Sequence, residues 1–175
     1  NNTYAALPGY NINLFTRKSR REEYSNLTSI VKKMLPKSPV ILLFPTFDVA
    51  TPSDHVVAFD SLASLLRSDQ QVILLSDYPI LDKHPIRVNK SIVKSSDTGF
   101  NLEYRTPPAE IMNFIKSHDN FHYLDLSDSK AFDNAPYYND TLMYYDVDHL
   151  NIYGSKVYAK FSGDKLGSLI VELLH

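Results

Sequence analysis

The chain has 175 residues, of which 43% are hydrophobic and 22% are charged, as expected for one ordinary globular domain. Its formal net charge of -2 argues against a general polyanion-binding surface, so nucleic acid is not an expected partner. The absence of cysteine excludes disulfides, thiolate zinc sites and a cysteine nucleophile. No apolar run approaches the roughly 20 residues of a membrane-spanning helix.

Three short segments predict strands. The first two are continuous apolar runs, which is typical of strands that are buried on both faces of a parallel sheet, and the third is also expected to be a strand. Their ranges are Val40–Phe44, Val72–Leu75 and Phe121–Asp125.

Helical spacing of apolar residues predicts helices before, between and after these strands. The expected helices are Tyr24–Leu35, one capped by Ser53 or Asp54, one opened by Pro107-Pro108, and Leu150–Leu174 with Gly163 and Gly167 as possible breaks. The alternation of helix and strand is the signature of a three-layer α/β domain with a parallel sheet and right-handed crossovers.

Ligands of such domains bind at the carboxyl ends of the strands, and a long loop follows the third predicted strand. This loop ends in Asp146 and His149, a D-x-x-H spacing just before the last helix. A carboxylate three residues before an imidazole can accept from Nδ1–H, which leaves Nε2 free as a general base. On spacing alone a structural turn stays open, with Asp148 or Asn151 acting only as caps.

The residues around this pair, Y-Y-D-V-D-H-L-N-I-Y-G-S from Tyr144 to Ser155, resemble the last conserved block of SGNH/GDSL hydrolases. They look most like the SGNH domain fused to acyltransferase-3 membrane proteins that O-acetylate bacterial polysaccharides. Val40–Phe44 and Val72–Pro79 are similar to two of that family's strands. The resemblance implies a three-layer, flavodoxin-like SGNH sheet with helices on both faces.

The resemblance also implies an activity. His149 would be the catalytic base and Asp146 its orienting carboxylate, with Asp148 as the second choice. The chemistry would be O-acetyl transfer through an acyl-serine, without a cofactor or a metal. The partners would be an acetyl donor, a surface polysaccharide, and a membrane acyltransferase domain upstream in the same polypeptide. The domain would then be extracytoplasmic and tethered to the inner membrane.

One feature departs from the family: the Gly-Asp-Ser block that carries its nucleophile is absent from the sequence. We therefore expect residues 1–175 to be a single SGNH-like domain that forms the C-terminal portion of a larger one. The serine-bearing N-terminal strand would lie outside this chain. Ser53 and Ser76, which follow predicted strands, are the alternatives within it. A carbohydrate esterase and an inactive carbohydrate-binding domain remain open.

Two further groups of side chains are candidates for binding. Twelve tyrosines are present, four of them near the D-x-x-H loop: Tyr137, Tyr138, Tyr144 and Tyr145. Flat rings with a hydroxyl suit sugar faces, so Tyr144 and Tyr145 are candidate substrate contacts, although packing onto the core is an alternative. His118 and His122 have a metal-like spacing, but it crosses a predicted helix end, which favours surface histidines.

Overall fold

The computed structural model describes residues 33, 38–43, 51–89 and 99–175. The expected helix Tyr24–Leu35, apart from Lys33, lies outside the described residues. The contacts divide the chain into two compact units, which are described in turn. The first combines the chain up to Ser76 with Thr106–Leu124, and the second combines Asp77–Arg105 with Asp125–Leu173.

A parallel sheet forms the centre of the first unit. Among the described residues it has three strands in the order β1 (Val40–Leu43), β2 (Gln71–Leu75) and β5 (Phe121–Leu124). Both neighbouring pairs are parallel. The burial of Val72 to Leu75 in the middle strand explains why its sequence is continuously apolar. The predicted α/β fold with a parallel sheet is confirmed.

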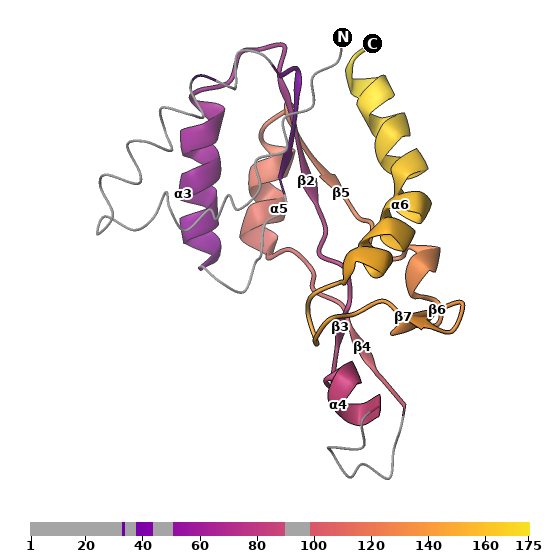
Figure 1. Cartoon of the computed structure of the whole chain (residues 1–175). Helices are drawn as coiled ribbons and strands as arrows, with labels where there is room; N and C mark the ends of the chain where they lie inside the picture. The colour runs from indigo at the N-terminus through magenta and orange to yellow at the C-terminus, as the bar shows by residue number, and fades with distance from the viewer. Residues whose placement is uncertain (1–32, 34–37, 44–50, 90–98) are drawn as a thin grey trace. The chain divides into compact units, whose positions relative to one another are not determined.

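Two helices, α3 (Pro52–Ala63) and α5 (Ala109–Lys116), lie side by side on one side of the sheet (Figure 1). They share a core with one face of the sheet, and its buried members are Phe59, Leu62, Val72, Leu74, Ile111, Phe114, Ile115 and Phe121. Each large apolar side chain buried in this way contributes about 1.5–3 kcal/mol of transfer free energy. This core accounts for the apolar spacing that predicted both helices.

The start of α3 corrects one prediction. Its N-cap is Thr51, rather than Ser53 or Asp54. Thr51 Oγ1 accepts from the Asp54 N–H at 3.3 Å, and the Asp54 carboxylate accepts from the Thr51 N–H at 3.3 Å. This is a reciprocal capping box, in which Asp54 is the third helical residue.

The second unit contains short elements where long loops were expected. They are β3 (Ile80–Leu81) paired with β4 (Leu102–Glu103), α4 (Pro85–Asn89), a 3-10 helix at Lys130–Phe132, and β6 (Tyr137–Tyr138) paired with β7 (Thr141–Leu142). The turn between β6 and β7 has positive φ at both Asn139 (46°) and Asp140 (57°). That geometry matches the twist of a tight hairpin, and Asn and Asp tolerate it best after glycine.

The last element, α6 (Ile152–Leu173), runs without interruption through Gly163 and Gly167. The predicted breaks at these glycines are therefore wrong, because an isolated glycine costs a helix only about 1 kcal/mol relative to alanine. The buried members of this unit's core are Leu81, Ala131, Phe132, Met143, Tyr144 and Val157. Over the described ranges, no helix has both the length and the apolar character that a membrane crossing requires.

Candidate active site

The loop that carries Asp146 and His149 is closed by backbone hydrogen bonds. Tyr144 and Leu150 form an antiparallel bridge, and the Tyr145 N–H donates to the His149 carbonyl at 2.8 Å. Asp146 to Asp148 therefore lie in a short turn between two points that the backbone fixes.

Asn151 connects this turn to α6. Its side-chain amide donates to the Leu142 carbonyl at 2.7 Å, and its side-chain oxygen accepts from the Gly154 N–H at 2.8 Å. The second bond satisfies an N–H at the start of α6 that has no partner within the helix, as an N-cap does. Asn151, one of the two caps that the sequence left open, therefore caps α6 and also ties the loop that carries Asp146 and His149 to the helix.

Gly154 allows the loop and the helix to approach closely. A Cβ at this position would overlap the Met143 carbonyl oxygen and lie 2.9 Å from both the carbonyl carbon and the Cβ of Met143. Only glycine lets the first turn of α6 lie against this backbone. Gly154 is therefore required by the packing of the loop against α6.

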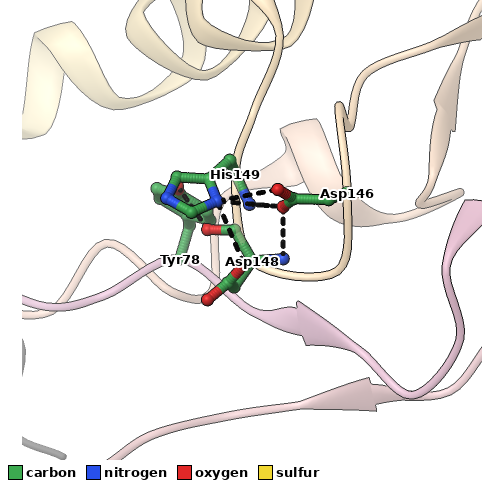
Figure 2. A network of polar contacts seen from close by, with 4 residues as sticks. All are labelled: Tyr78, Asp146, Asp148 and His149. Carbon is green, nitrogen blue, oxygen red and sulfur yellow. Dashed lines mark hydrogen bonds and ion pairs between the residues drawn. The ribbon is translucent and has the colours of Figure 1, made fainter.

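Asp146 and His149 are in direct contact (Figure 2). His149 Nδ1 lies 2.9 Å from Asp146 Oδ1 and 3.1 Å from Oδ2. An ionised carboxylate only accepts hydrogen bonds, so Nδ1 must carry the proton in this contact. The lone pair of the neutral imidazole is then on Nε2, which is the arrangement that a general base needs.

Asp148 is a second carboxylate beside the same ring, with Oδ1 3.0 Å from His149 Nδ1. Two observations favour Asp146 as the orienting group. Asp146 Oδ1 also accepts the backbone N–H groups of Asp148 (3.1 Å) and His149 (2.8 Å), so its position is fixed. Its side chain is 28% exposed, against 43% for Asp148.

The contacts shift both pKa values in the directions of a stable ion pair. The hydrogen bond to Asp146 raises the pKa of His149 above its ordinary value, and the nearby carboxylate charges add to this effect against a smaller opposing effect of desolvation. Desolvation acts to raise the pKa of Asp146, but hydrogen bonds from the Asp148 N–H and from His149 outweigh it and lower that pKa. The carboxylates therefore stabilise the imidazolium that forms when His149 Nε2 accepts a proton.

Tyr78 is a residue of this network that the sequence did not indicate. Its hydroxyl donates to the carbonyl oxygen of Asp148 at 2.8 Å, which ties the turn to the segment after β2 (Figure 2). Burial raises the pKa of Tyr78, so the hydroxyl keeps its proton as a donor. The two residues are 70 positions apart, and no local pattern points to such a contact.

The two candidate tyrosines lie in different surroundings. Tyr144 is fully buried, and its hydroxyl donates to the Pro79 carbonyl at 2.6 Å. It offers no surface to a substrate, and its place in the core replaces the expected binding role. Tyr145 is 66% exposed and follows directly on it in the chain. Of the other two, Tyr137 donates to Asn89 Oδ1 at 2.7 Å, and the Tyr138 ring packs edge-on against Phe161.

The remaining sequence candidates have structural partners. Ser53 Oγ lies 2.9 Å from Thr51 Oγ1 at the start of α3, and Ser76 is buried at the end of β2. His118 Nδ1 lies 2.9 Å from the Phe114 carbonyl, and His122 Nε2 lies 2.7 Å from Gln71 Oε1.

Three side chains of the loop are of the types that bind cations. Ligand atoms of Asp146, Asp148 and His149 lie within 4.8 Å of one another. Hydrogen bonds within the loop already account for the positions of these atoms, so we assign no metal to them.

Comparisons with known proteins identify the family of the chain. The family model of the SGNH domain fused to AT3 domains matches residues 8–161. The chain therefore belongs to this SGNH domain family. A comparison with curated proteins found no match.

Among solved structures, the chain resembles the periplasmic domain of the lipopolysaccharide acetyltransferase of Salmonella ser. Paratyphi A. The two are 17% identical in sequence, with a TM-score of 0.51. The match covers 82% of this chain and 61% of that one, so the chain spans about three fifths of the length of the solved domain. This likeness supports the shared fold.

Proposed function

We propose that this chain supplies the histidine and the aspartate of a Ser-His-Asp O-acetyltransferase that modifies a bacterial surface polysaccharide. The observation that carries the proposal is the Asp146–His149 contact, with Nδ1 2.9 Å from a carboxylate whose position two backbone N–H groups fix. Membership of an SGNH family whose domains are fused to AT3 domains supports the class of chemistry. The acetyl donor would reach the site through such a membrane domain, upstream in the same polypeptide. The catalytic domain would then be extracytoplasmic and tethered to the inner membrane.

The nucleophile is proposed to be a serine outside residues 1–175, in the N-terminal part of the same SGNH domain. The support is the absence of a Gly-Asp-Ser block from the sequence. Within the chain, Ser53 and Ser76 have capping and core surroundings instead.

The first half-reaction forms the acyl-enzyme. His149 Nε2 removes the serine proton while the serine oxygen attacks the acetyl carbonyl carbon. The bond to the donor's leaving oxygen then breaks, and His149 returns the proton to that oxygen. Asp146 stabilises the imidazolium that exists between these two steps.

The second half-reaction runs through the same groups. A saccharide hydroxyl attacks the acetyl-serine while His149 Nε2 takes its proton. The serine oxygen leaves and regains a proton from His149, and the acetylated saccharide is released. Each proton that His149 accepts is returned, so the enzyme ends as it began.

An SGNH carbohydrate esterase is the second candidate, and the exposure of His149 favours it. The side chain is 68% exposed, so water could reach the base and replace the saccharide as the attacking group. The same dyad would then remove acetyl groups from a polysaccharide.

Two measurements on the purified full-length protein test the proposal. A fluorophosphonate probe should label the wild-type protein and fail to label the His149→Ala variant. Absence of labelling in both would favour an inactive carbohydrate-binding domain. Acetyl transfer to a saccharide and acetate release, measured on the same sample, then separate the transferase from the esterase.

A further inference from the structure

A groove of about 760 Å³ lies beside the catalytic dyad. Its lining comes from one continuous segment, from β7 through the catalytic loop to the first turn of α6. The lining includes Leu142, Tyr145, Asp146, His149, Ile152 and Tyr153. The proposed base is therefore part of the wall of the groove.

The groove is bordered by apolar side chains that the protein leaves in water. Ile152 is 79% exposed and Tyr145 is 66% exposed, the two highest values among the large hydrophobic residues of the described chain. Ile152 is the first residue of α6, and at this exposed position a polar residue would be equally compatible with the helix. Exposed apolar surface next to a reactive group is typical of a ligand-binding site.

The polar groups of the lining are mostly engaged inside the protein. Both side-chain groups of Asn151 bond to the backbone of Leu142 and Gly154. The Tyr153 hydroxyl donates to the Tyr138 carbonyl at 3.0 Å. A ligand therefore meets mainly apolar and aromatic walls, and the other polar residues of the lining are Thr141, Asp146 and His149.

The charge of the groove is negative. Asp146 belongs to the lining, Asp148 lies 3.0 Å from His149 Nδ1, and neither Lys nor Arg is among the lining residues. A carboxylate or phosphate on the ligand would be repelled. The ligand that fits is neutral, with one apolar face and a hydroxyl at its edge.

We propose that this groove is the saccharide subsite of the enzyme, and that Tyr145 and Ile152 select a neutral sugar ring. The inference rests on the proposed function and names its substrate class. The C–H face of a pyranose packs on the Tyr145 ring and the Ile152 side chain, with one hydroxyl directed to His149. The base must lie within hydrogen-bond distance of the saccharide oxygen in transfer, where it attacks, and in ester hydrolysis, where it leaves. The sugar therefore occupies this side of the dyad in either direction.

The test uses the full-length protein with Tyr145→Ala and Ile152→Ala. The control is Val171→Ala, a similarly exposed residue (57%) near the other end of α6. Initial rates are measured with a neutral oligosaccharide acceptor and, separately, with p-nitrophenyl acetate. We expect the KM for the oligosaccharide to rise about five- to tenfold in each groove variant, the loss of roughly one apolar contact. The rise in KM for p-nitrophenyl acetate should be several-fold smaller. The Val171→Ala variant should have the wild-type KM for both substrates.

A second arm measures binding without catalysis, by saturation-transfer NMR with the neutral oligosaccharide and with its uronic-acid analogue. The neutral sugar should bind more tightly, and Tyr145→Ala should weaken its signals. Unchanged KM and binding in both groove variants would overturn the subsite while leaving His149-dependent labelling intact. A fall of several degrees in the melting temperature of both variants would also overturn it, since their side chains would then cover another part of the protein. If His149→Ala has no effect on labelling but Tyr145→Ala abolishes sugar binding, the proposed function fails and the subsite stands.

Discussion

One oxygen of Asp146, Oδ1, accepts both the backbone N–H of His149 at 2.8 Å and its ring Nδ1 at 2.9 Å. The same carboxylate therefore fixes where the histidine sits in the chain and how its ring is turned (Figure 2). This double role needs a separation of three residues within a tight turn. A short local motif is therefore sufficient to fix the orientation of the His149 ring.

Replacing Asp146 by Asn should cost the enzyme most of its activity. The amide can present its NH₂ group to Nδ1 and favour the wrong tautomer, and it cannot stabilise the imidazolium. We expect a loss in kcat of about 10³-fold or more, measured with p-nitrophenyl acetate on the full-length protein. Asp148→Asn is the matched control and should lose less than about tenfold, because its carboxylate receives no backbone bond from His149. A larger loss for Asp148→Asn would assign the orienting role to Asp148.

The activity should depend on the protonation of His149 in a defined direction. The carboxylates stabilise the imidazolium and raise its pKa above 6.5, so the ring stays protonated, and inactive as a base, to a higher pH than a free histidine. The rate should therefore rise with pH through a pKa above 6.5 and level off beyond it. NMR titration of the His149 ring should show this value falling in Asp146→Asn. An unchanged or higher pKa in that variant would contradict the ion pair.

Alanine substitutions at Gly154 and Gly163, both in α6, should change the stability of the protein in opposite directions. Alanine at Gly154 would overlap the Met143 carbonyl group, and such overpacking costs about 1–3 kcal/mol. Alanine at Gly163 meets no atom within 4 Å and should raise the free energy of unfolding by about 0.5–1 kcal/mol. Chemical denaturation of the two variants measures both values. Equal stabilities would show that α6 does not depend on the close approach at Gly154.

Tyr144 and Tyr145 should contribute very differently to the stability of the fold. Tyr144→Phe leaves the buried Pro79 carbonyl without its 2.6 Å partner, which should lower the free energy of unfolding by about 1–3 kcal/mol. Tyr145→Phe changes an exposed side chain and should leave stability within about 0.5 kcal/mol of the wild type. Thermal or chemical unfolding checks both. A stable Tyr144→Phe variant would show that this hydroxyl does not support the loop.

Much of the fold could be predicted because its signals are local. The apolar residues of the strands and the proline before α5 act over a few residues. The structure has the three strands within a residue or so of the predicted bounds. The cap of α3 was missed by two or three residues, since Ser, Thr and Asp all cap helices and only the geometry shows that Thr51 does so. The short elements between Ile80 and Glu103 were missed because strands of two residues carry no periodicity.

The residues of the site also differ in whether the local sequence could predict them. Asp146 and His149 could be proposed from the sequence because three residues separate them. Tyr78 could not, because its bond to Asp148 spans 70 positions. The burial of Tyr144 beside the exposure of Tyr145 also follows from the tertiary structure, since two adjacent tyrosines are equivalent in a sequence.

The acetyl content of the surface polysaccharide tests the role of the dyad most directly. Cells that produce the full-length protein, with His149→Ala or with the control His175→Ala at the exposed end of the chain, would be compared by NMR of the purified polysaccharide at equal protein levels. We expect His149→Ala to reduce O-acetylation to the background of cells without the protein, and His175→Ala to match the wild type. Wild-type acetylation in the His149→Ala cells would contradict a catalytic role for the Asp146–His149 pair.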